Sequence, residues 1–151
     1  MPPEITIPYL QKIIDSLAQC RALGIHVREI TSGRVTLELP YDEKIVGNPV
    51  SRVIHGGALT TLLDTNCGMS LVARLGQIVI APTLDLRIDY MTTAKPDMPV
   101  YSHAEVFRDT KNVIFCRGIA YQDEIEKPIA HCVATFMRLD KETLQNSNAV
   151  N

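Results

Sequence analysis

A helical pattern of apolar residues marks the first part of the chain. Pro8 suits the first turn of a helix and Gly24 suits its end, so the pattern predicts a helix over residues 8–22. The apolar residues that recur at helical spacing in this segment are Leu10, Ile13, Ile14 and Leu17.

A second and longer helix is predicted over residues 56–75. The run is apolar along most of its length and is followed by Gly76, a residue type that commonly ends helices. Asp64 is the only charged residue between Gly56 and Ala73. A helix that is apolar on all sides packs in an interior, so we expect this one to be buried almost all round.

Strands and turns account for the rest of the pattern. Two short β-rich runs at 25–30 and 35–39 flank a serine-glycine pair, which predicts a hairpin. Residues 40–54 follow neither period and predict a loop with room for one helical turn, while the polar residues 140–151 predict a frayed tail. Four further strands are predicted over residues 78–91, 100–108, 113–121 and 129–138.

Two features of these strands predict the fold class. Apolar residues alternate with polar ones from Thr83 to Tyr90, which is the period of an antiparallel sheet with one covered face. In the last two strands one parity is small and leaves room for a helix: Cys116, Gly118, Ala120, Ala130, Cys132 and Ala134. We therefore predict a single α+β domain over residues 1–151, with an antiparallel sheet wrapped around a central buried helix.

Composition and charge narrow the classes of function. The 151 residues are 46% hydrophobic and 21% charged, as in an ordinary globular domain, and the net charge of -2 provides no basic field for nucleic acid. The N-terminal prolines and glutamate do not match a signal peptide, and no segment is apolar enough to span a membrane, so a cytoplasmic protein is expected. The four cysteines lie far apart, which predicts neither a metal site nor disulfides.

Asp64 and the glycine pair that opens its helix are the candidate chemistry. A lone carboxylate on an apolar helix is costly unless it is hydrogen-bonded or functional, so Asp64 is either a catalytic group or a tie to a neighbouring loop backbone. The sequence His55-Gly56-Gly57 would open the first N–H groups of the helix to a substrate, as an oxyanion hole. The alternative is a flexible junction at which His55 is a cap or a core residue.

The spacing of these two elements predicts a shared site. Asp64 lies eight residues beyond Gly56, roughly 12 Å along a helix, so the two cannot address one carbonyl from the same helix. Two antiparallel helices across a twofold axis would bring each carboxylate to its partner's glycine pair. Small residues suit that approach, and those placed on the Asp64 face are Gly57, Thr60, Thr61, Cys67 and Gly68.

The segment GNPVSRVIHGGALTTLLDTNCGMSLVA, followed by APTLDLRIDYMTTAKP, resembles the hotdog-fold acyl-CoA thioesterases of the phenylacetate-degradation type. The resemblance is carried by His-Gly-Gly with an aspartate nine residues after the histidine, within a pattern that extends from Val35 to Phe136. It implies a hotdog fold and hydrolysis of acyl-coenzyme A without metal or cofactor. It also implies a homodimer or a dimer of dimers, a homotetramer, with active sites at the dimer interface.

The resemblance also implies residue roles. Asp64 would be the general base or nucleophile, the Gly56 amide would polarise the thioester carbonyl, and the Thr83 hydroxyl would orient water. Asn48 would contact the thioester from the loop, although it lies seven residues before His55 where many members have six. The substrate-binding candidates are His55, Gly57, Thr60, Arg52 and Lys95.

Several alternatives stay open at this point. Arg52 stands where a glycine is common; it and Lys95 could reach the phosphates of coenzyme A or could be solvated surface charges. A hydratase or dehydratase on the same fold would need a histidine beside a carboxylate, and His55 is expected to turn inward. An acyl-CoA sensor would keep the pocket without turnover. Cys67 is expected to pack in the core rather than act as a nucleophile.

Overall fold

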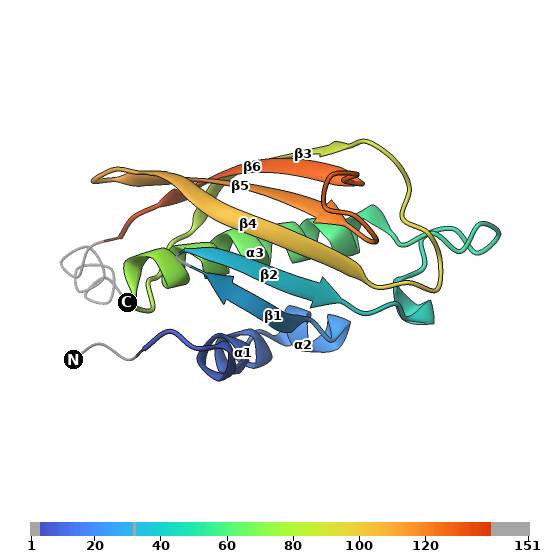
Figure 1. The fold of residues 1–151 in the computed structure, drawn as a ribbon, viewed down its shortest axis with the longest axis horizontal. Coiled ribbons are helices and arrows are strands. Elements are labelled where there is room, and N and C mark those ends of the chain that lie inside the picture. Colours follow the sequence, from blue (N-terminus) through green and yellow to red (C-terminus); the bar gives the residue numbers. More distant parts are fainter. Residues whose placement is uncertain (1–3, 32, 140–151) are drawn as a thin grey trace, which may run out of the picture.

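The computed structural model describes residues 4–31 and 33–139, and in them an antiparallel sheet of six strands lies over one long helix (Figure 1). The strand order is β1-β2-β4-β5-β6-β3, so β1 and β3 are the edges. This confirms the predicted α+β class with a sheet around a central helix. The strands are β1 (His26–Thr31), β2 (Arg34–Leu39), β3 (Thr83–Tyr90), β4 (Val100–Asp109), β5 (Val113–Tyr121) and β6 (Ala130–Met137).

The predicted first helix is broken into two, α1 (Ile7–Ser16) and α2 (Ala18–Leu23). A single helix over 8–22 was therefore wrong, because Leu17 adopts an extended conformation with ψ 111°. The break lets each short helix turn its own apolar residue, Ile14 or Cys20, into the core, while Leu17 stays exposed. Gly24 ends α2 in the left-handed conformation with φ 67°, as the sequence predicts.

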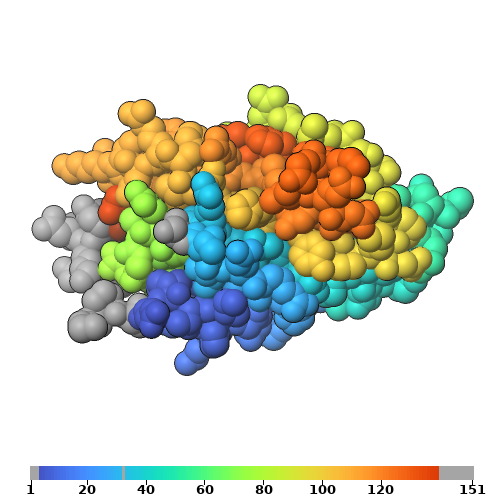
Figure 2. Space-filling model, viewed as in Figure 1, coloured from blue at the N-terminus to red at the C-terminus, as the bar shows by residue number. Residues whose placement is uncertain are grey.

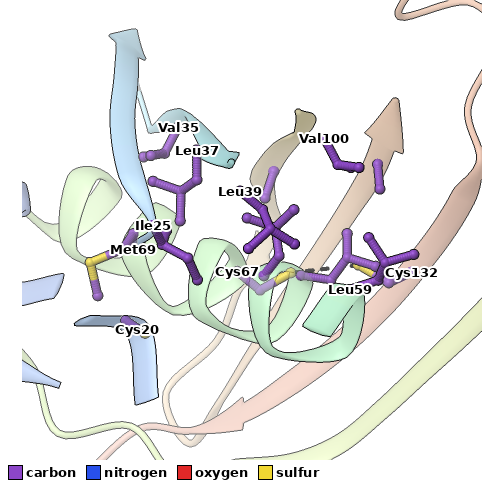
Figure 3. Packing of buried hydrophobic residues seen from close by; sticks show 14 of the residues in the cluster. Cys20, Ile25, Val35, Leu37, Leu39, Leu59, Cys67, Met69, Val100 and Cys132 are labelled. Atoms are coloured by element: carbon purple, nitrogen blue, oxygen red, sulfur yellow. Dashed lines mark hydrogen bonds between the residues drawn. The ribbon is translucent and has the colours of Figure 1, made fainter. Parts of the chain in front are cut away.

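The central helix α3 (Gly56–Leu75) has the predicted bounds. Gly76 closes it with φ 67°, and its buried side packs against β2, β4 and β5. The helix is less buried than predicted, because the face that carries Thr61 and Asp64 is only half-buried. Cys67 does not share that face: it is buried against the sheet, with its Sγ 3.8 Å from the Sγ of Cys132 (Figure 3).

Small residues on β5 and β6 let the helix lie close to the sheet, as predicted. Gly118 shows how little room remains, since a Cβ there would lie 3.1 Å from the Sγ of Cys132 and 3.3 Å from the Cβ of Ala104. Cys116, Ala120 and the small residues of β6 are also buried beneath α3. The core therefore sits between the helix and the middle of the sheet.

The loops and ends of strands depart modestly from the predictions. The β1–β2 hairpin is confirmed, and the loop after β2 contains one 3-10 turn, η1 (Glu43–Ile45). Residues 46–54 then project from one end of the molecule (Figure 2). The strand predicted over 78–91 begins only at Thr83, because Pro82 has no N–H for a ladder and the segment before it is largely exposed.

The predicted tail over residues 140–151 lies outside the described residues. Among the helices of the described part, none combines the length and hydropathy that a membrane crossing needs.

Candidate active site

A β-bulge brings Thr83 to Asp64. Thr83 pairs with Phe136 and Asp85 pairs with Thr135, so Leu84 is an extra residue in β3. The alternation of apolar and polar residues along β3 would put Thr83 on the polar face of the sheet, with Asp85 and Arg87. The bulge instead turns Thr83 to the face that packs on the helix. The Thr83 Oγ1 donates to the Asp64 Oδ1 at 3.0 Å. The partner of Asp64 is thus a side chain of β3 and not the loop backbone considered from the sequence.

The Gly56 N–H is left open at the start of α3. His55 is the N-cap, and its Nδ1 accepts from the Gly57 N–H at 2.9 Å. The Ala58 N–H donates to the His55 carbonyl at 3.0 Å. Within residues 4–31 and 33–139, the Gly56 N–H has no protein acceptor. The first turn therefore offers a donor that a substrate oxygen could take.

His55 is exposed, so the expectation that it turns inward was wrong. Its ring instead folds back over the first turn of the helix to reach the Gly57 N–H. Because Nδ1 accepts this bond, a neutral ring carries its proton on Nε2. The capping role weighed from the sequence is what the geometry shows.

Tyr90 covers the same end of the helix and was missed in the sequence. Its hydroxyl donates to the Gly56 carbonyl at 2.9 Å and lies 3.0 Å from the Thr60 Oγ1, which itself donates to that carbonyl at 3.1 Å. The available signal was the β3 alternation, which places Tyr90 on the helix side with Leu86 and Ile88. A cavity of about 180 Å³ adjoins this end of α3; its lining includes Val53, Ile54, Gly56, Leu59, Tyr90 and Ala94.

On the projecting loop, neither Asn48 nor Arg52 hydrogen-bonds to Asp64 or Gly56 within the described residues. The Asn48 Oδ1 accepts from the Val50 and Ser51 N–H groups at 2.9 and 3.2 Å, which folds the loop on itself. Arg52 has φ 58°, a left-handed conformation that explains why a glycine suits this position. Its guanidinium binds Asp97 at 3.0 and 2.9 Å and also contacts Glu43.

Lys95 lies near the same end of the molecule, beside a groove of about 250 Å³ that also includes Thr92 and Thr93. Its Nζ is 2.6 Å from the Asp123 Oδ2, and this carboxylate raises the pKa of Lys95. Thr92 and Thr93 also line the cavity next to Gly56, so the groove and the cavity are neighbours.

Cys67 is not a reactive thiol in this structure. The hydrogen bond with the Cys132 thiol, together with burial, raises the pKa of the Cys67 thiol well above its ordinary value. A buried and protonated thiol is a poor nucleophile, which agrees with the core role predicted for Cys67. In the part of the chain that the structure describes, no group of three or more His, Cys, Asp or Glu side chains could hold a metal ion.

The chain thus presents two candidate half-sites, Asp64 with Thr83 and Gly56 with Tyr90. They sit on one regular helix, eight residues and roughly 12 Å apart. The carboxylate and the open N–H therefore belong to different half-sites. The arrangement can activate water at one place and polarise a carbonyl at another.

Comparisons with known proteins bear on the family and the fold. A family model described as Thioesterase superfamily matches residues 52–129. A crystal structure of a Pseudomonas aeruginosa protein is 50% identical, covers 88% of this chain and 98% of its own, and superposes with a TM-score of 0.80. The Escherichia coli PaaI protein of the phenylacetic acid degradation operon is 18% identical with a TM-score of 0.75, over 86% of this chain and 90% of its own.

A curated relative from Halobacterium salinarum, named "Putative esterase", is 32% identical over 92 residues. The match covers 59% of this chain and spans 61% of that relative's length. Together with the strand order, the structural neighbours confirm the hotdog fold expected from the sequence.

Proposed function

The chain belongs to the thioesterase superfamily, and from this membership we propose that it hydrolyses acyl-CoA thioesters to a free acid and coenzyme A. The observation that carries the proposal is the pair of half-sites on α3: a carboxylate that accepts from Thr83, and an open Gly56 N–H at the helix start. Both elements lie in the segment that resembles the phenylacetate-degradation thioesterases.

The chemistry needs one proton acceptor and one site for negative charge. Water held by the Thr83 hydroxyl attacks the carbonyl carbon while Asp64 takes its proton, and the charge on the carbonyl oxygen gathers beside the Gly56 N–H and the helix dipole. Collapse of the intermediate breaks the C–S bond, and the proton passes to the leaving thiolate. Direct attack by Asp64 would instead form a mixed anhydride, which water then hydrolyses.

A homodimer, alone or paired into a dimer of dimers, would join the half-sites. Since Gly56 and Asp64 of one helix are too far apart, the carboxylate that serves each Gly56 would be the one on the other protomer. Two features of this chain suit that assembly. β3 is an edge strand with Leu84 50% exposed, and the half-buried face of α3 carries small residues around Asp64.

The remaining candidates take supporting roles in this proposal. The Asn48 Nδ2 and the Thr60 hydroxyl would face the thioester, whereas His55 holds the Gly57 N–H and shapes the oxyanion hole. Lys95 would meet a phosphate of coenzyme A at the end of the groove. Arg52 would have to leave two carboxylates to do so, and we assign it to holding the loop.

The test is acid and thiol release from a panel of acyl-CoAs, measured for the wild type and for Asp64→Asn. We expect hydrolysis by the wild type and a loss of about a hundredfold or more in the variant, with acyl-CoA binding retained. Asp15→Asn, on the exposed side of α1, is the matched control and should keep full activity. Hydration of an enoyl-CoA without acid release, or saturable binding without any turnover, would replace the proposal with one of its two alternatives.

A further inference from the structure

The peptide group between Gly56 and Gly57 is held on both sides. Its carbonyl accepts from the Tyr90 hydroxyl at 2.9 Å and from the Thr60 hydroxyl at 3.1 Å. Its N–H donates to the His55 Nδ1 at 2.9 Å. Side chains from the helix, its cap and the edge strand therefore converge on one peptide plane.

Two adjacent glycines make such fixing necessary. Glycine has more backbone freedom than any other residue, and neither Gly56 nor Gly57 needs a positive φ here. An oxyanion donor stabilises a transition state only if it is aimed before the reaction, because reorientation during the reaction cancels part of the gain. A flexible glycine pair would aim the Gly56 N–H poorly without an external constraint.

We infer that Tyr90 is a positioning residue of the oxyanion hole: its hydroxyl fixes the Gly56–Gly57 peptide and thereby aims the neighbouring Gly56 N–H at the substrate carbonyl. This inference rests on the proposed function. Tyr90 acts through the backbone and not on the reacting atoms. Tyr90, Thr60 and His55 all hold this peptide, and Tyr90 alone among these three comes from outside the helix and its cap. It therefore couples the position of β3 to the geometry of the oxyanion hole.

The location of Tyr90 argues against a role in stability alone. Tyr90 is 52% exposed and lies at the end of an edge strand. Loss of an exposed hydroxyl that leaves the ring in place changes stability little. A phenylalanine would keep the ring at the helix start, where the ring Cζ lies 3.5 Å from the place of a Cβ on Gly56, and would remove only the hydroxyl. The hydroxyl contact is therefore separable from the packing of the ring.

Tyr90→Phe tests the inference kinetically. We expect kcat to fall roughly tenfold, which corresponds to about 1.4 kcal/mol, with KM and the melting temperature nearly unchanged. The control is Tyr9→Phe on α1, which packs against β1 at the other edge of the sheet from β3, and this loss of a tyrosine hydroxyl should leave kcat unchanged (Figure 1). A kcat within twofold of the wild type, or a loss confined to KM, would overturn the inference.

A spectroscopic measurement separates this inference from the proposed function. Benzoyl-CoA labelled with carbon-13 at the thioester carbonyl is bound to Asp64→Asn, and the carbonyl stretch is recorded by Raman difference spectroscopy. Polarisation by the Gly56 N–H lowers the stretching frequency of the carbonyl. The double variant Asp64→Asn, Tyr90→Phe should show a smaller lowering than Asp64→Asn alone. An unchanged shift in the double variant would refute the role of Tyr90 while leaving the thioesterase proposal standing. If the wild type neither binds nor hydrolyses any acyl-CoA, both fail.

Discussion

Thr83→Val removes the one side-chain hydrogen bond that the structure gives to Asp64. Valine matches threonine in shape and suits a strand, and the residue is exposed, so the free energy of unfolding should change by less than about 0.5 kcal/mol. Water can replace this exposed hydrogen bond in the resting protein, but the attacking water would lose the hydroxyl that orients it beside Asp64. We expect kcat to fall roughly tenfold, which corresponds to about 1.4 kcal/mol in the barrier.

The assay compares Thr83→Val with Thr83→Ser, using acid release under saturating acyl-CoA. Serine retains the hydroxyl and should keep activity within a few-fold of the wild type, while binding of substrate stays similar in both variants. Equal activity of the valine variant and the wild type would show that the hydroxyl does not serve the carboxylate. Equal damage by serine and valine would show that the methyl group matters and the hydrogen bond does not.

Three further predictions concern assembly, acid stability and packing. Thr61→Trp enlarges the half-buried face beside Asp64 and should weaken oligomerisation and activity together, measured by sedimentation; a fully assembled and active variant would refute the close helix contact. Arg117 and Arg34 hold the pKa of Glu105 below its ordinary value of 4.5, so the pairing stabilises the fold above that pH and is lost as pH falls through the lowered pKa. The melting temperature of Glu105→Gln should therefore lie below that of the wild type near pH 7, and the two should converge as the pH falls through the lowered pKa of Glu105; a constant gap would contradict this. Gly118→Ala should destabilise the fold by about 1–3 kcal/mol in chemical denaturation, because its Cβ would press on the Cys132 sulfur, and an unchanged midpoint would show that the site has spare room.

Residues that follow one periodicity were predictable from the sequence. The bounds of α3 and its end at Gly76 follow from an apolar run closed by a glycine, and the small residues of β5 and β6 indicated where the helix would lie. Leu17 broke the pattern, since tertiary packing of two short helices outweighed a continuous helical face. Local pattern cannot foresee that choice.

The candidate site divides in the same way. His55, Gly56 and Asp64 could be found from spacing because all three lie on or next to one helix. The contact between Thr83 and Asp64 depends on the bulge at Leu84, and bulges carry no period. Tyr90 reaches Gly56 across 34 positions of sequence, so its role depends on how β3 lies against α3. The union of the two half-sites depends on a second protomer and stays a prediction.

Subunit complementation tests the shared active site most directly. Asp64→Asn and Gly56→Val each inactivate one half-site. Gly56 has no positive φ, and its new side chain would meet the end of the exposed Tyr90 ring, which can move aside, so both chains should fold. Chains co-expressed in equal amounts assemble at random, half of the dimers are mixed, and each mixed dimer regains one intact site. The account predicts about a quarter of wild-type acyl-CoA hydrolysis from two inactive variants. Activity no higher than that of either variant alone would contradict a site built from Gly56 of one protomer and Asp64 of its partner.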